Sequence, residues 1–373
     1  MNLTYTEVAE SLLTENGGRN PAAFRRRIAA NPTQMDCINR TSILMQHYEE
    51  GSRRAGFDLA EAISSNDLVK FSVGAIIDRQ ILAAYDSLPQ QWRKFLVRVP
   101  LRDFKKKSLA EVVLGSQVFK DVPEFGPFPH LKGPELDEKF IQARKTGGLW
   151  GFSFEASVND DLDQLMRIPR AFPQIASDTE DDRGLRLMID LETGNLNTDF
   201  FTVGNANVGT LVLTAENLET VYGNLTTKRT SDGKLISAGR LQLVVGPALQ
   251  TLAERILNAE KVPSPGNPGL YIENPLRGKF DLVVNEKQPG QSWIVMPRPG
   301  TVARAPFFFG QVTGYESPDF RYKNDQGRAL GGGDLTVMAG SFDDDSVWYR
   351  GRHILGEAHG WAEITYGSDN SGM

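Results

Sequence analysis

The residues that could perform chemistry in this sequence are its histidines, its single cysteine and several groups of carboxylates. The histidines are His47, His130, His353 and His359, and the last two flank Glu357. Two histidines and a carboxylate form a donor set that zinc can take. None of the four, however, has the HExxH spacing or a comparable one that places two ligands on one helix face. The spacing therefore predicts structural or surface histidines and no metal site.

Three groups of neighbouring carboxylates could in principle hold calcium or act as general acid and base. The Asp-Asp-Asp triplet at 343–345 lacks the alternating ligands and central glycine of a calcium loop, so we expect a solvated turn. Asp160 and Asp161 are explained by helix capping, because carboxylates at the start of a helix accept hydrogen bonds from its free backbone amides. We read the Glu-Asp-Asp run at 180–182 as a solvated helix face.

Nucleophilic and phosphate-binding motifs are also missing from the sequence. Cys37 is the only cysteine, has no partner for a disulfide within the chain, and lacks a context that marks it as a nucleophile. No G-x-S-x-G motif occurs. The glycines at 331–333 lack the lysine and the strand-to-helix context of a phosphate-binding loop. The sequence therefore predicts neither an enzyme nor a cofactor site.

The clearest structural pattern lies between residues 149 and 191. Trp150, Phe152 and Phe154 fall on one face of a predicted strand, because successive side chains point to opposite sides. The Asn-Asp-Asp cluster at 159–161 then predicts a helix start.

Behind this cap, apolar residues recur at the spacing of three and four that gives a helix one apolar face. They are Leu162, Leu165, Met166, Pro169, Phe172 and Ala176. We expect Pro169 and Pro173 to divide the pattern into a short helix and a longer one that reaches about Leu191, because proline removes an amide and clashes with the preceding turn.

The first seventy residues read as short helices without a core of their own. Asn20 and Pro21 match a helix cap with proline at the first helical position. Arg25, Arg26 and Arg27 follow, either as a solvated helix face or as part of an arm whose arginines meet DNA phosphates or an acidic scaffold.

A helix over residues 72–88 is predicted from an apolar stripe that we assign to the core, and a strand over 95–104 follows. Two strand candidates, 109–119 and 136–143, then flank a proline-rich centre. An isolated two-stranded ribbon is marginal in water, so this excursion needs a surface to lie on.

Residues 195–209 read as a polar linker, and the part after it alternates strands and helices. Its expected elements are a helix capped by Thr214, strand 241–245, a helix from Pro247, a loop at 261–269, and strands 280–284 and 292–296. Strands are again expected at 307–309, 335–339 and 362–366, returning to complete the first sheet.

Composition describes an ordinary core-forming chain of 373 residues with 40% hydrophobic and 24% charged residues. No apolar run approaches the length that spans a bilayer, and the first residues do not read as a secretory signal. The net charge of −6 argues against a protein whose main task is to grip nucleic acid.

Five features in order resemble the major capsid proteins of tailed bacteriophages, most closely the Mu-like major head subunit group with the HK97-type capsid fold. They are Trp92 at a helix end and the segments VPLRDF (99–104), VPEFG (122–126), VNDDL (158–162) and WYRG (348–351). The likeness is carried by their order and spacing, and it extends from about Phe71 to the C-terminus.

The resemblance implies an α+β, HK97-type fold. Its parts would be an N-terminal arm (1–70), a peripheral domain (71–104), an extended loop or β-ribbon (105–148), the peripheral domain with its long spine helix (149–205), an α/β axial domain (206–305) and a return to the peripheral domain (306–373).

The resemblance also implies a capsid subunit that assembles with itself, as hexamers and pentamers, into an icosahedral shell around double-stranded DNA. Further partners would be a scaffold protein and a portal during assembly, DNA bound without sequence specificity, and optionally a decoration protein, with no membrane. The expected location is the virion capsid, assembled in the host cytoplasm.

Contacts between subunits would involve the extended loop. Lys105, Lys106 and Lys107 are either a solvated turn or partners of acid on a neighbour, and Glu124, Phe125 and Phe128 are further candidates. The interior-facing candidates are the three arginines of the arm. Alternative functions are an encapsulin-like cargo compartment of the same fold, a phage tail component, and least of all a soluble α/β enzyme.

Overall fold

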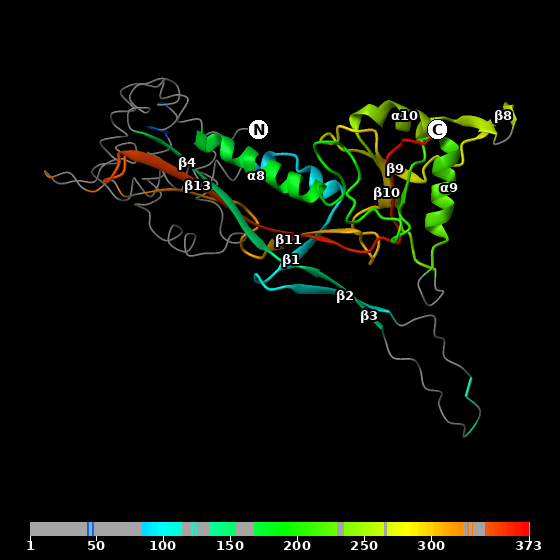
Figure 1. Ribbon diagram of the computed structural model, residues 1–373, viewed down its shortest axis with the longest axis horizontal. Coiled ribbons are helices and arrows are strands. Elements are labelled where there is room, and N and C mark those ends of the chain that lie inside the picture. Colours follow the sequence, from blue (N-terminus) through cyan, green and yellow to red (C-terminus); the bar gives the residue numbers. More distant parts are fainter. Residues whose placement is uncertain are drawn as a thin grey trace. The chain divides into compact units, whose positions relative to one another are not determined.

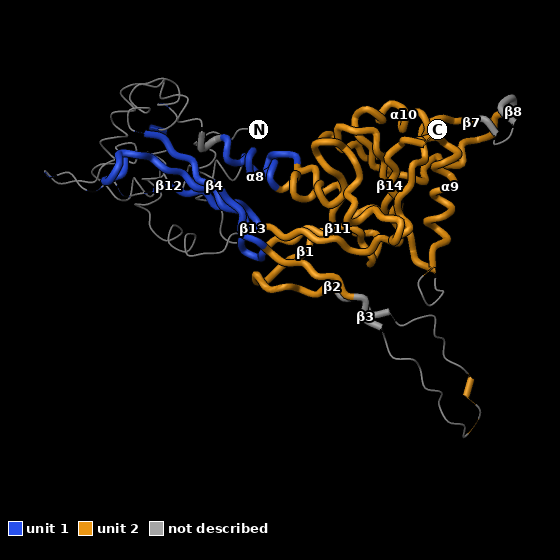
Figure 2. The backbone as a smooth tube through the Cα atoms, viewed as in Figure 1, with its two compact units in different colours: residues 1–89, 144–179, 312–354 blue, residues 90–143, 180–311, 355–373 orange. Residues whose placement is uncertain are grey.

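The computed structural model describes most of the chain from residue 84 onward. The described ranges are 84–113, 135–153, 168–229, 235–264, 267–323 and 340–372, with isolated residues between them. The expected arm (1–70), most of the 72–88 helix, the 159–161 cap, the 331–333 glycines and the 335–339 strand lie outside them. The chain forms two compact units, shown in Figure 2: unit 1 is 1–89, 144–179 and 312–354, and unit 2 is 90–143, 180–311 and 355–373.

Unit 2 is built on a five-stranded sheet with the order β5-β14-β10-β6-β9 (Figure 1). β6 pairs with β9 in parallel, and β10 runs antiparallel to both β6 and β14. The strands are β5 (Val208–Gly209), β6 (Leu241–Val245), β9 (Phe280–Val284), β10 (Trp293–Pro297) and β14 (Tyr366–Ser368). The predicted strands 241–245, 280–284 and 292–296 are confirmed, whereas the one expected at 362–366 begins only at Tyr366.

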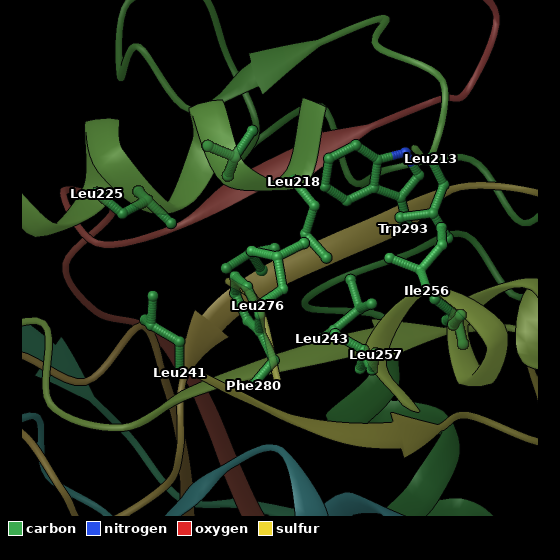
Figure 3. Close-up of a cluster of buried hydrophobic side chains, with 14 of the residues drawn as sticks. Leu213, Leu218, Leu225, Leu241, Leu243, Ile256, Leu257, Leu276, Phe280 and Trp293 are labelled. Atoms are coloured by element: carbon green, nitrogen blue, oxygen red, sulfur yellow. The ribbon is translucent and has the colours of Figure 1, made fainter. Parts of the chain in front are cut away.

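Both faces of this sheet are covered, which explains why all five residues of β6, Gln242 included, are buried. Leu241, Leu243 and Val245 belong to one buried cluster with Trp293, while Val244 belongs to a second cluster. Because side chains alternate along a strand, the two clusters lie on opposite faces. Figure 3 shows the first cluster.

Two helices contribute to this first cluster, α9 (Ala215–Thr226) and α10 (Pro247–Asn258). The Thr214 hydroxyl accepts a hydrogen bond from the Asn217 amide at 3.2 Å, so α9 begins at the predicted cap. α10 begins with Pro247 at its first position, where the missing amide removes no helical hydrogen bond. Both helix predictions are confirmed.

The second cluster lies on the other sheet face and is formed by segments far apart in sequence. Its members include Trp92 of the short helix η1 (Gln91–Lys94) and Phe95, which follows that helix. Phe200 and Phe201 also belong to it. The two phenylalanines are only 2% and 3% exposed, so the prediction of a simple linker over 195–209 is wrong. Its polar residues form turns around side chains that the core requires.

A second sheet contains β1 (Val97–Leu101), β11 (Phe307–Val312), β13 (Ser346–His359), β12 (Asp319–Tyr322) and β4 (Arg144–Ser153). In unit 2, β1 pairs with β11, which pairs with the C-terminal part of β13 from Phe307↔His359 to Gln311↔Leu355. In unit 1, β12 and β4 both pair with β13. The predicted return of the last part of the chain to an earlier sheet is confirmed for β11, but β14 joins the other sheet.

Within unit 1, β4 confirms the expected aromatic strand face for Trp150 and Phe152, while Phe154 lies outside the described ranges. The rings of Trp150 and Phe152 lie 5.5 Å apart, as residues two apart on one strand face should. Phe172 stacks on Phe320 of β12 at 5.3 Å and approaches Tyr349 of β13. This aromatic packing buries the start of the long helix against the sheet.

That helix, α8 (Ile168–Leu185), begins one residue before Pro169 and continues through Pro173. The break expected at Pro173 is therefore wrong, and the expected short helix before Pro169 lies outside the described ranges. Pro173 lies near the helix start, where its missing amide costs one hydrogen bond. Burial of Phe172, Pro173 and Ala176 offsets this cost. The helix also ends at Leu185, before the expected end at Leu191.

Two hairpins belong to neither large sheet. β2 (Lys107–Val113) and β3 (Glu135–Ile141) pair antiparallel, which confirms the predicted ribbon strands as far as they are described, since residues 114–119 lie outside the described ranges. β7 (Lys261–Ser264) and β8 (Asn267–Glu273) form a second hairpin where a loop was expected. The prolines and glycine there suggested a loop, but Val262 and Ile272 pair across the ladder, and the register shift at Pro263 and Ser264 accommodates the irregularity.

Candidate assembly surfaces

Two of the four histidines have defined packing roles. The imidazole Nδ1 of His353, which is 5% exposed, accepts a hydrogen bond from the Ile354 amide at 3.0 Å. His359 Nε2 lies 3.1 Å from the Leu187 carbonyl oxygen, and its ring packs against Phe200 at 5.2 Å. Burial lowers the pKa of His359, and the hydrogen bond to Leu187 opposes this shift only in part.

The carboxylate between these histidines has another partner. Glu357 forms an ion pair with Arg183 at 3.4 Å. Within the described ranges, no group of three or more histidine, cysteine or carboxylate side chains is arranged to hold a metal ion.

The turn at 343–345 is solvated, as predicted, since all three aspartates are exposed. Asp344 accepts hydrogen bonds from the hydroxyls of Ser341 and Ser346. These bonds stabilise the ionised carboxylate and lower the pKa of Asp344 to about 2.

The Glu-Asp-Asp run at 180–182 is not a solvated helix face. Glu180 and Asp181 are 0% and 2% exposed, and both bind Trp92. The Trp92 amide donates to Asp181 Oδ1 at 2.9 Å, and its indole Nε1 donates to Glu180 Oε2 at 3.0 Å. Only Asp182 faces solvent, where it pairs with Arg186 at 2.9 Å.

Trp92 joins several parts of unit 2. Its ring stacks on Phe309 of β11 with centroids 4.1 Å apart, and Gly184 of α8 lies so close that a Cβ there would be 2.9 Å from the Trp92 Cβ. Lys287 adds an ion pair to Asp181 at 3.2 Å. The segment that leads into β1, and from there into the β2–β3 ribbon, is therefore fixed to the end of α8.

The ribbon begins at the predicted lysines. Lys105, Lys106 and Lys107 are all exposed, and Lys107 Nζ donates to the Pro100 carbonyl at 2.8 Å. The Lys105 amide donates to Asp103 at 2.9 Å, which closes the turn between β1 and β2. Glu124 is exposed, while Phe125, Phe128 and the arm arginines Arg25, Arg26 and Arg27 lie outside the described ranges.

Two aromatic residues at the base of the ribbon were missed by sequence reasoning. Phe104 is 49% exposed and Phe140 is 54% exposed, whereas the neighbouring Ile141 is 1% exposed. The sequence held a signal for Phe140. Adjacent strand residues point to opposite sides, so one of two neighbouring large apolar residues must face outward.

Comparison with known protein families identifies the chain. A family model described as phage capsid protein matches residues 136–363, more than half of the sequence. The chain belongs to the phage capsid protein family.

Solved structures similar to this phage capsid protein share little sequence with it. A chain from Mycobacterium phage Patience is 15% identical, with 81% of this chain and 87% of that chain covered and a TM-score of 0.46. A chain from Gordonia phage Cozz is 13% identical, with 74% and 84% covered and a TM-score of 0.45. No curated protein matches the sequence.

Family membership confirms the main functional prediction. The phage capsid protein is a structural subunit of a phage shell and not an enzyme. Its mixture of helices and sheets confirms the α+β class. No helix in the described ranges is long and apolar enough to cross a membrane.

Proposed function

We propose that this phage capsid protein is the major head subunit, of the HK97 type, and that it assembles with copies of itself into an icosahedral shell around double-stranded DNA. The observation that carries this proposal is the β2–β3 ribbon. Figure 1 shows its strands extending away from the sheets of unit 2. Among the strands that the structure describes, each of the two pairs only with the other.

A ribbon of this kind is incomplete within one subunit. Two-stranded hairpins are marginally stable in water and need a surface to pack on. Phe140 of β3 is 54% exposed, which adds an apolar group without cover at the ribbon base. Packing of the ribbon over a neighbouring copy supplies that surface, in a contact between two different faces that closes into rings.

The other expected parts of a head subunit are included in the proposal. The arm (1–70) lies across a neighbour, with Arg25, Arg26 and Arg27 toward the interior, and residues 206–305 gather around the five-fold and six-fold axes. The extended loop with Glu124, Phe125 and Phe128 contacts the adjacent subunit. Hexamers and pentamers form in the host cytoplasm with a scaffold and portal, and a decoration protein is optional. The mature location is the virion.

Deletion of residues 119–134, the centre of the extended loop, tests the overlap. The expected product is a folded subunit that forms no closed particles, seen by negative-stain electron microscopy beside the wild-type chain. Folding is monitored by fluorescence of Trp92 and Trp293, which are 1% and 0% exposed and report on unit 2. Normal heads from the shortened chain would refute the overlap role.

A further inference from the structure

Positive charge is concentrated in one short segment of this acidic chain. Residues 91–109 contain seven lysines and arginines and one aspartate, a net charge of +6. Because the whole chain carries −6, the remainder carries −12. The segment covers η1, β1 and the start of β2.

These cations are all exposed at the surface of unit 2. In β1, Val99 and Leu101 are buried, so Arg98 and the following Arg102 point to the solvent side. Lys107 reaches back to β1, because its ammonium group donates a hydrogen bond to the carbonyl of Pro100 at 2.8 Å. Together with the exposed turn before β2, these side chains form a basic strip, which consists of Arg98, Arg102, Lys105, Lys106 and Lys107.

Arg98 has an interaction within the subunit, whereas the other four cations of the strip have no carboxylate partner in the described part of the chain. The one carboxylate of the segment, Asp103, accepts a hydrogen bond from the Lys105 amide. Like charges that lie side by side without acid to neutralise them are unfavourable, so Arg102 and the three lysines are suited to an anionic partner.

We propose that the basic strip docks onto surface carboxylates of a second copy of this chain and sets the register between neighbours. The proposal rests on the self-assembly proposed above. The strip leads directly into the β2–β3 ribbon, so one neighbour can receive both. Each copy supplies abundant acid, given the −12 outside the segment.

A protein partner is favoured over DNA by the aromatic residues beside the strip. Phe104 lies within it in sequence and Phe140 is on β3 near its end, with exposures of 49% and 54%. The Phe104 carbonyl accepts a hydrogen bond from Gln142 at 2.9 Å, which ties the turn to the end of β3. Aromatic residues and arginine together are typical of protein interfaces.

Neutralisation of the strip tests the proposal. The triple variant Arg102→Gln, Lys105→Gln, Lys106→Gln should raise the critical subunit concentration for assembly by about tenfold, with a weaker dependence on salt than wild type. The matched control is Arg186→Gln, Lys323→Gln, Arg350→Gln, which removes three exposed cations that lie outside both the strip and residues 206–305. An equal effect of the two variants on assembly would overturn the proposal.

Cross-linking identifies the partner directly. A carbodiimide joins a lysine amine to a carboxylate as an amide, with the lost water taken up to form a urea. Wild-type oligomers made from a mixture of ¹⁴N and ¹⁵N subunits should give mixed-isotope peptides that link Lys105, Lys106 or Lys107 to aspartate or glutamate. Strip links found only within one subunit would contradict the proposal, whatever the shape of the oligomers.

The alternative partner, DNA, is tested by measuring how a double-stranded DNA fragment binds to wild type, to the strip variant and to the control variant. If the strip variant assembles like the control but binds DNA more weakly than both other proteins, the strip is a nucleic-acid surface and the proposal is wrong. Absence of closed wild-type particles would instead contradict the proposed head function, and the cross-links would still report on the strip.

Discussion

The backbone amide of Trp92 donates a hydrogen bond to the Asp181 carboxylate at 2.9 Å, across 89 residues of sequence. The same carboxylate forms an ion pair with the Lys287 ammonium group at 3.2 Å. A buried acceptor at the end of α8 therefore fixes the short helix η1, from which β1 and the β2–β3 ribbon follow. This relationship leads to two of the predictions below.

Replacement of Asp181 by alanine should lower the free energy of unfolding by about 2–4 kcal/mol, because it leaves the buried Trp92 amide without an acceptor and Lys287 without its counter-charge. Asp182→Ala is the matched control. Its carboxylate forms a surface pair with Arg186, so a change below about 0.5 kcal/mol is expected. Urea unfolding followed by tryptophan fluorescence measures both, and equal losses would show that Asp181 has no special role.

The ionisation of Asp181 should make stability depend on pH in a defined direction. Burial raises its pKa above 3.8, although the Trp92 amide and Lys287 oppose the shift. The folded state thus binds the proton more tightly than the unfolded state. As pH rises from 3.8 through the folded pKa, wild type should lose stability relative to Asp181→Asn, and the difference should then become constant. A difference that shrinks over this range would contradict the raised pKa.

His359 should contribute an opposite dependence at mildly acidic pH. Burial lowers its pKa below 6.5, so the folded state binds the proton less tightly than the unfolded state. Stability should fall as pH decreases from 6.5 through the folded pKa, because the buried imidazole must then become charged. His359→Gln keeps a donor for the Leu187 carbonyl and cannot titrate. Thermal unfolding of the two proteins across this range should show a steeper acid loss for wild type, and parallel curves would exclude His359 as the cause.

Two glycines with the same backbone conformation separate strain from close packing. Gly194 and Gly278 have φ values of +74° and +75°, a region that disfavours side chains. A Cβ on Gly194 would lie 2.2 Å from the Gly290 amide nitrogen, whereas one on Gly278 would meet nothing within 4 Å. Gly278→Ala should cost about 1 kcal/mol, and Gly194→Ala about 3 kcal/mol or more. Denaturant midpoints measure the difference, and similar costs would mean that the loop holding Gly290 moves away freely.

Features that depend on neighbouring residues in the chain could be predicted from sequence. The Thr214 cap, the start of α10 at Pro247 and the mostly apolar strand β6 each depend on local hydrogen bonding or on side-chain alternation. The paired strands of the ribbon were predicted for the same reason. The ordered set of motifs around Trp92 and the WYRG segment was enough to identify the family, because a family pattern persists where no single motif is specific.

Features that depend on contacts with segments distant in the sequence were decided only by the tertiary structure. Glu180 and Asp181 read as solvated because their sequence neighbours are acidic, yet η1 packs on them and supplies two donors. Pro173 read as a helix break because the aromatic packing that offsets its lost hydrogen bond comes from other strands. The basic strip likewise required β1 to bury Val99 and Leu101 before Arg98 and Arg102 had a common side. Local sequence thus determined which hydrogen bonds and faces each element could offer, and burial against remote partners determined which of them were used.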